Sequence, residues 1–209
     1  MRVALSALLI AGSLGSCAFL TDDGFQPVQN NLRLTADVSY ASDLEIDGPA
    51  GSASSDFDEE MYQLAYEWED ADGFAPYVQV GRGSWTFDWP GDVDIVRWNA
   101  GARWYGGELG DDGGWFDNTR AYGDLSLSLI DPESFQDGNE YHRYHTALSV
   151  NFGAGLQRHL HNGMFFELGA RASFGQASEV VRDQVAIVSA ENDWDWYHVN
   201  LVIGVGRRF

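Results

Sequence analysis

The 209-residue chain contains no lysine, only one cysteine and only five prolines. Its 12 basic residues, all arginine, are outnumbered by 32 acidic ones, and the net charge is −20. Such a chain repels phosphate backbones, which excludes nucleic acid as a partner. The lone cysteine, Cys17, excludes an intrachain disulfide and a cysteine-based zinc site. Beyond the N-terminus no apolar run is long enough for a spanning helix, which excludes a helical membrane protein.

The residues that are abundant favour strands. The chain has 24 glycines, 8 tryptophans, 9 tyrosines and 12 phenylalanines, a composition that suits an all-β protein. Hydrophobic residues make up 44% of the chain and aromatic residues 14%, which excludes intrinsic disorder.

The N-terminus predicts an export signal. Arg2 supplies a positive charge, residues 3–14 are apolar, and small residues follow. Two cleavages stay open. Residues 14–17 resemble a bacterial lipobox, in which Cys17 is lipidated, whereas Ser16 and Ala18 suit ordinary cleavage before residue 19. We therefore expect a signal peptide at 1–18, a polar linker at 19–30 and a single β-barrel domain at 31–209.

Alternation of apolar and polar residues predicts eight strands of about ten residues, the length that a tilted strand needs to cross a bilayer. They lie at 31–40, 61–69, 76–86, 95–105, 119–129, 144–157, 164–175 and from Tyr197 onwards. Arg82 falls on an apolar face, so we expect a bulge there. The connections after the second and sixth strands are short, and those after the first, fifth and seventh are longer, whereas those after the third and fourth break this rhythm.

The same alternation describes either a soluble calycin-type barrel or an outer-membrane barrel with its apolar face against lipid. Aromatic residues near the ends of the apolar stripes favour the membrane barrel, since rings prefer the headgroup level. We expect this aromatic girdle at Tyr40, Tyr62, Trp68, Trp104, Tyr144, Phe166, Phe174 and Tyr197. A lipid-anchored or soluble periplasmic binding barrel stays as an alternative, favoured by an apolar lumen.

The polar faces are rich in small residues and carry charges of both signs, as a narrow lumen requires. We expect structural ion pairs in the lumen among Arg33, Asp37, Glu67, Arg97, Arg103, Arg120, Asp124, Glu167 and Arg171. The alternative for these charges is a selective pore. A third indication is terminal Phe209, which resembles the C-terminal assembly signal of outer-membrane proteins, although Arg207 departs from that pattern.

On these features the chain resembles the small eight-stranded outer-membrane barrels of the OmpA and OmpX type, from about Leu32 to Phe209. The resemblance implies an up-and-down antiparallel transmembrane barrel in a Gram-negative outer membrane, with short periplasmic turns and longer extracellular loops. It implies as partners membrane lipid, lipopolysaccharide and the barrel-assembly machinery. We expect a monomer with a structural or surface-interaction role, no cofactor, no metal and no catalytic residue.

Three further patterns carry alternatives. His145 and Ser149 share a predicted face near His142, which would suit a lipid hydrolase resembling lipid A deacylases. Acidic residues in the predicted loops would suit divalent cations or a solvated surface. They are Asp43, Glu45, Asp47, Asp56, Asp58, Glu59, Glu60, Asp92, Asp94, Asp111, Asp112, Asp193 and Asp195. Trp85, Phe87 and Trp89 would form an exposed patch or extend the girdle, and His159 and His161 lie in a predicted solvated turn.

Overall fold

The computed structural model describes residues 28–49, 51–87, 92–110, 116–183 and 188–209. The predicted signal peptide, Cys17, Trp89, Asp111 and Asp112 lie outside these residues. The described chain is built from strands, and none of it forms a helix long and apolar enough to span a membrane. The strands are β1 Gln29–Gly48, β2 Gly51–Ser55, β3 Phe57–Glu69, β4 Phe74–Phe87, β5 Asp92–Glu108, β6 Thr119–Pro132, β7 Phe135–Asp137, β8 Glu140–Tyr144, β9 Ala147–His159, β10 Met164–Asp183 and β11 Val188–Arg208.

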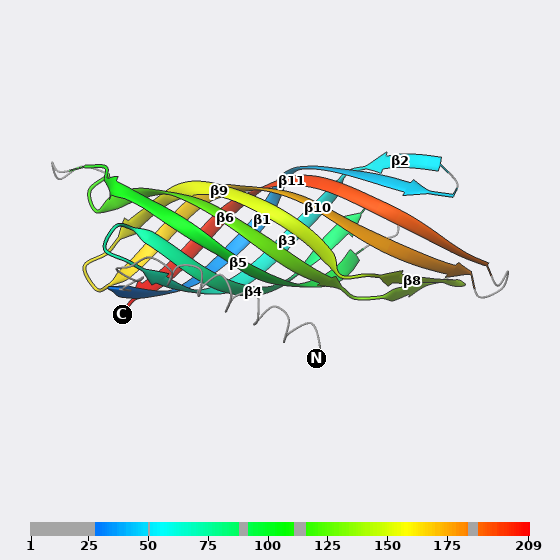
Figure 1. Ribbon diagram of the computed structural model, residues 1–209, viewed down its shortest axis with the longest axis horizontal. Helices are drawn as coiled ribbons and strands as arrows, with labels where there is room; N and C mark the ends of the chain where they lie inside the picture. Colours follow the sequence, from blue (N-terminus) through cyan, green and yellow to red (C-terminus); the bar gives the residue numbers. More distant parts are fainter. Residues whose placement is uncertain (1–27, 50, 88–91, 111–115, 184–187) are drawn as a thin grey trace, which may run out of the picture.

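Eight of these strands close into an antiparallel ring in the order β1-β3-β4-β5-β6-β9-β10-β11, because β11 pairs with both β10 and β1. Each predicted strand corresponds to one of the eight. The short strand β2 folds back on β1, and the β7–β8 hairpin continues along β10 beyond the end of β9. Figure 1 shows β2 and β8 at the same end of the barrel, opposite the end where β11 finishes.

The two faces of the wall have opposite chemistry. Large apolar side chains such as Leu168 and Ile203 point outward and are each 60% exposed, whereas Asp37 and Glu167 point inward and are buried. A soluble barrel buries its apolar face, so this arrangement requires lipid on the outside. The fold is that of an eight-stranded transmembrane β-barrel.

Two tight turns, between β3 and β4 and between β9 and β10, lie at one end of the barrel, where the connection between β5 and β6 is longer. Asp70 accepts hydrogen bonds from the amides of Asp72 and Phe74 at 3.0 and 2.8 Å, and Gly73 takes φ 80°. These contacts form the short connection expected after the second predicted strand. Asn162 similarly accepts from the amide of Met164 at 3.1 Å, and Gly163 takes φ 79°. Short turns mark the periplasmic side of such barrels, so the opposite end is extracellular.

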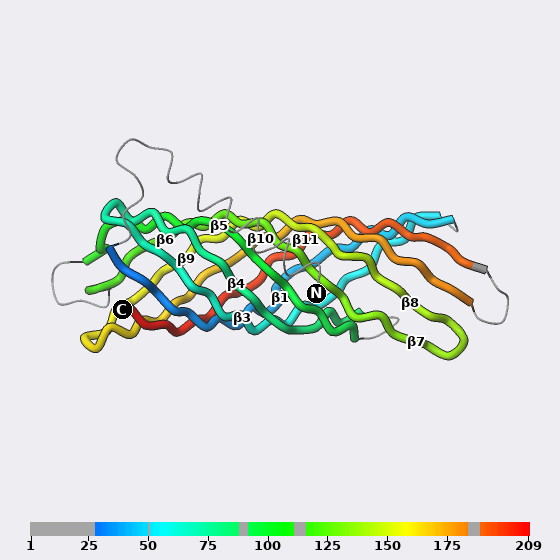
Figure 2. The backbone as a smooth tube through the Cα atoms, turned by 60° about the horizontal axis from the view of Figure 1, so that its bottom comes forward, coloured from blue at the N-terminus to red at the C-terminus, as the bar shows by residue number. Residues whose placement is uncertain are grey.

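At the extracellular end the strands run further than predicted. The segments 41–60 and 176–195, expected to be connections, instead contribute the ends of β1 and β10, the start of β11, and β2 and β3. Figure 2 shows these strands extending well past the rest of the barrel, together with β7 and β8. Backbone pairing continues between β10 and β11 as far as Asp183 and Val188.

Two irregularities change which residues face inward. The register between β1 and β11 shifts at Tyr40, and one extra residue lies between the end of β8 and the start of β9 opposite β10. After each shift the odd and even positions exchange faces. The bulge predicted at Arg82 is wrong, because β4 pairs without interruption on both sides and Arg82 simply points outward to Asp94, 2.9 Å away.

Candidate functional site

The lumen is the first candidate site, and its periplasmic half is held together by Arg103. This side chain is completely buried and forms a bidentate contact with Glu167, at 2.7 and 3.1 Å. It also contacts Asp124 at 3.2 Å. The guanidinium carbon lies 3.8 Å from the centre of the Tyr122 ring, and the Tyr122 hydroxyl donates to Glu167 at 3.0 Å. Charges removed from water are stable only when paired in this way.

Arg33 joins the same group from β1. Its guanidinium lies 3.4 Å from Glu67 and 3.5 Å from Glu167, so it bridges carboxylates on two other strands. The Tyr105 hydroxyl donates to Glu67 at 2.7 Å. The result is one continuous network that links β1, β3, β5, β6 and β10 across the lumen.

Two further ion pairs flank this network. Arg120 holds Glu69 at the periplasmic side and lies 3.5 Å from the centre of the Tyr105 ring. On the other side, Arg171 contacts Asp37 at 2.6 Å, and Asp37 also accepts from the Gln63 amide at 2.7 Å. These charges, which the sequence assigns to the lumen, therefore lie there. The two ion pairs join β6 to β3 and β10 to β1, strands that are far apart in sequence.

A belt of neutral polar residues lies above the charges. Asn99 donates to Gln63 at 2.8 Å and to Gln79 at 3.0 Å, while Asn151 donates to Ser126 and Ser128 at 3.1 and 2.6 Å. All six side chains are buried. Amide and hydroxyl groups can satisfy one another here without any net charge.

The next level contains a second charged centre that the sequence interpretation missed in part. Arg97 grips Glu59 through both of its terminal nitrogens, and Trp85 Nε1 and Asn200 Nδ2 donate to the same carboxylate at 2.9 and 2.7 Å. His198 lies 3.5 Å from it. Glu59 was placed with the acidic loop residues. The period-two pattern of Gln63 and Glu67, continued in both directions, assigns both Glu59 and Glu69 to the lumen.

Above this level the lumen is apolar, which corrects the expectation of a polar interior throughout. Twelve buried residues pack into one cluster inside the barrel: Leu44, Phe57, Met61, Trp85, Phe87, Val93, Ile95, Ile130, Tyr144, Ala147, Trp194 and Trp196. We call this cluster the aromatic seal. Its rings meet edge to face, with centroids 5.4 Å apart for Trp85–Trp196 and for Phe87–Trp194.

The aromatic seal corrects several expected positions. Trp85 and Phe87 form no exposed patch, because both lie inside the barrel. Tyr144 is 6% exposed and packs on Trp194, so it does not belong to the outer girdle. The physical reason is the shift between β8 and β9, which turns Tyr144 inward and His145 outward.

The same shift separates the residues of the hydrolase hypothesis. His145 is exposed and contacts Ser178 at 3.0 Å, whereas Ser149 is buried and donates to Asn151 at 3.2 Å. His142 points inward and contacts Glu179 at 2.6 Å. His145 and Ser149 therefore do not share a face, and the expected proximity is wrong.

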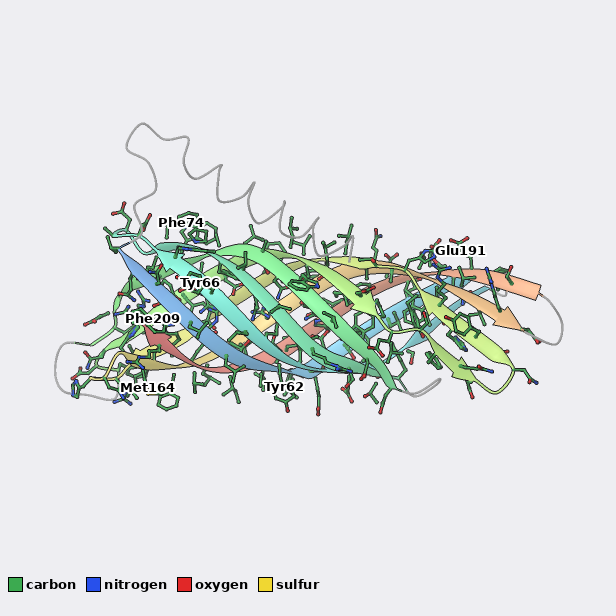
Figure 3. All side chains as sticks on the ribbon, turned by 90° about the horizontal axis from the view of Figure 1, so that it is seen from below. Tyr62, Tyr66, Phe74, Met164, Glu191 and Phe209 are labelled. Carbon is green, nitrogen blue, oxygen red and sulfur yellow. The ribbon has the colours of Figure 1, made fainter. Side chains whose placement is uncertain are left out.

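The other girdle positions lie on the outer face. Tyr40, Tyr62, Trp104, Phe166, Phe174 and Tyr197 are exposed, and Trp68 is half-buried against Tyr66, with ring centroids 4.9 Å apart. Figure 3 shows Tyr62 projecting away from the barrel wall. Pairs such as Phe174–Tyr197, 5.0 Å apart, form at one end of the apolar belt, and Phe74–Trp104, 5.4 Å apart, forms at the other. Phe209 is 67% exposed, and its amide donates to the Asn30 carbonyl at 2.9 Å.

Most of the acidic residues expected in loops lie on extended strands instead. Asp43, Glu45 and Asp47 point outward from β1, and Glu45 and Asp47 pair in register with Asp195 and Asp193 of β11. Like charges opposite one another are unfavourable in a sheet, and water screens them here. Among the described residues no group of three or more His, Cys, Asp or Glu is arranged to hold a metal ion.

Some inward glycines make room for rings. Tyr122 lies across Gly155 and Gly169, and Phe165 lies across Gly206, at the positions where a Cβ would otherwise sit. The small residues of the polar faces are therefore required by close ring contact as well as by the narrow lumen.

A closed barrel with an apolar outer belt and a paired, buried set of charges inside defines the class of small outer-membrane β-barrel proteins. No family model and no curated protein matches the sequence. The fold does have solved counterparts. The outer-membrane protein OprG from Pseudomonas aeruginosa superposes with a TM-score of 0.62 over 89% of this chain and 98% of that one, at 12% identity.

Neisserial surface protein A gives a TM-score of 0.49 at 14% identity, covering 86% of this chain and 97% of that one. The N-terminal barrel domain of Pseudomonas aeruginosa OprF gives 0.48 at 14% identity, covering 87% and 98%. Both scores lie below 0.5, and neither carries an argument about this chain. At 12% identity the similarity to OprG establishes the fold alone.

Proposed function

We propose that the protein is a closed, non-conducting barrel of the bacterial outer membrane, and that its extracellular end carries a structural or surface-interaction role. The observation that supports this most is that two layers of side chains, one charged and one aromatic, lie one above the other in the lumen. The network around Arg103 crosses the periplasmic half, and the aromatic seal fills the extracellular half. Eight strands leave an interior that side chains can fill, so two such layers would block ions.

The rest of the surface supports a passive role in the membrane. The apolar belt would contact lipid and lipopolysaccharide, and the acidic outer face of β1 and β11 would stand in water above it. We propose that the protein acts as a monomer without a cofactor, and that Phe209 serves the barrel-assembly machinery. We propose no catalytic role, because Ser149 donates its hydrogen bond to Asn151.

The test is conductance in planar lipid bilayers. The full-length protein, refolded in detergent and checked by its heat-dependent mobility shift on a gel, is added to the membrane. A general porin in the same lipid serves as the positive control. We expect no discrete current steps at voltages where the porin conducts. Reproducible unitary currents from the folded protein would contradict a closed lumen.

A further inference from the structure

A pocket of about 470 Å³ opens at the extracellular mouth of the barrel, directly above the aromatic seal. It is lined by Leu44, Phe87 and Trp194, which belong to the seal, and by Ile46 and Val181. The elements around it are the β2 hairpin, β8 and the far ends of β10 and β11, which Figure 1 shows together at this end. The pocket is thus a largely apolar hollow on a rigid base, the usual setting for a small ligand.

One wall of the pocket carries a buried carboxylate, Glu179. It is 3% exposed, its Oε1 lies 2.6 Å from His142 Nδ1, and its Oε2 accepts from Asn192 Nδ2 at 3.3 Å. Every other buried carboxylate in the described chain has an arginine partner: Asp37, Glu59, Glu67, Glu69, Asp124 and Glu167. Among those described residues, Glu179 alone has none. A buried carboxylate without a guanidinium is a favourable position for an added cation.

The other charged group that lines the pocket also favours a cation over an anion. Glu140 also lines it, 3.7 Å from His142, and none of the described residues that line it is an arginine. An anionic ligand would therefore be repelled. The ring of His142, which also lines the pocket, is stacked on Phe135 with centroids 4.6 Å apart.

We propose that this mouth pocket binds a small amphipathic organic cation, with its ammonium group at Glu179 and its apolar part against Phe87 and Trp194. Aromatic side chains beside a carboxylate attract alkylammonium groups through their π faces as well as through charge. The inference goes beyond the proposed function, because a ligand at the mouth requires neither an open nor a closed lumen. Conductance and ligand binding therefore test the two separately.

The experiment measures binding of benzyltrimethylammonium to the full-length protein in a nonionic detergent, by saturation-transfer NMR and calorimetry. The anion 3-phenylpropanoate, which carries the same ring with the opposite charge, is measured in parallel. We expect the cation to bind and the anion not to. Glu179→Gln, which keeps the shape of the side chain, should weaken cation binding at least tenfold.

The matched control is Glu191→Gln. Glu191 precedes Asn192 on β11, is exposed on the outer face and lies at the extracellular end in Figure 3. Its substitution removes the same charge from the same end of the barrel, so binding of the cation should stay within twofold. Ala53→Trp, on β2 at the rim, should block binding even if Glu179→Gln does not fold, as judged by the gel shift.

Three results would overturn the proposal. The first is no binding of the cation by the folded wild-type protein at millimolar concentration. The second is an equal loss with Glu179→Gln and Glu191→Gln, which would indicate a diffuse surface field. The third is equal binding of 3-phenylpropanoate.

Discussion

The indole ring of Trp196 on β11 lies across Gly175, its partner on β10, and occupies the space where a Cβ would sit. Gly175→Ala would push this ring out of place within the aromatic seal. Overpacking of this kind costs about 1–3 kcal/mol of unfolding free energy. Gly107→Ala is the matched control, because nothing lies within 4 Å of its Cβ position. Urea unfolding in lipid vesicles, followed by gel mobility, should show a lower midpoint for Gly175→Ala only.

The charged network predicts a large effect from loss of its central cation. Arg103→Gln leaves Glu167 and Asp124 buried without their main partner, and we expect a loss of about 3–5 kcal/mol in the free energy of unfolding. Arg82→Gln removes an arginine from an exposed pair with Asp94 and should change stability by less than about 0.5 kcal/mol.

A double substitution tests whether Arg103 and Glu167 stabilise each other. Arg103→Gln combined with Glu167→Gln removes one charge of each sign and should recover part of the lost stability. A single Arg103 substitution as mild as Arg82→Gln would show that the lumen is hydrated and that its pairs are not buried in practice.

Introducing a charge on the outward apolar face should lower the stability of the barrel, whereas a charge on the exposed face of a soluble protein has little effect. Leu168, between Ile203 and Leu156 on neighbouring strands, should tolerate lysine if it faced water. Facing lipid, Leu168→Lys should cost about 2–4 kcal/mol near the bilayer centre. Gln136→Lys on exposed β7 should be neutral. Equal stability of both variants in vesicles would mean that the faces are assigned the wrong way round.

His159, at the turn end of β9 beyond the lipid-facing residues, predicts a pH effect. Burial, aided by the positive charges of Arg208 and Arg120, lowers the pKa of His159 to about 4 from an ordinary value of 6.5. The unfolded chain therefore binds a proton between pH 6.5 and 4 that the folded chain does not, and stability falls as the pH decreases through this window.

NMR titration of the His159 side chain should give the lowered pKa directly. His159→Gln should remove its share of the pH dependence of unfolding between 6.5 and 4, so the stability of the wild type relative to the variant should rise from pH 4 to 6.5 and stay constant above this window. A measured pKa near 6.5 would contradict the burial of this ring.

Period-two alternation predicted all eight barrel strands because an extended chain places alternate side chains on opposite faces. The alternation also assigned Arg33, Arg103 and Glu167 to the lumen. It failed where the register shifts. Between β8 and β9 one extra residue reverses the alternation of inward and outward positions. Tyr144 therefore points inward and His145 outward.

The sequence by itself determined the barrel, its apolar outer belt and the charges of its interior, since these follow from local alternation and from the need to pair buried charges. Only the tertiary structure decided that the strands extend beyond the membrane and that the wall then reverses, with Asp43 outside and Leu44 inside. The reason is that the outer face leaves lipid for water there, so apolar side chains pack inward as in a soluble core. The tertiary structure also decided that Glu179 is the buried carboxylate of the described chain without an arginine partner. This depends on contacts between strands, which no local sequence pattern contains.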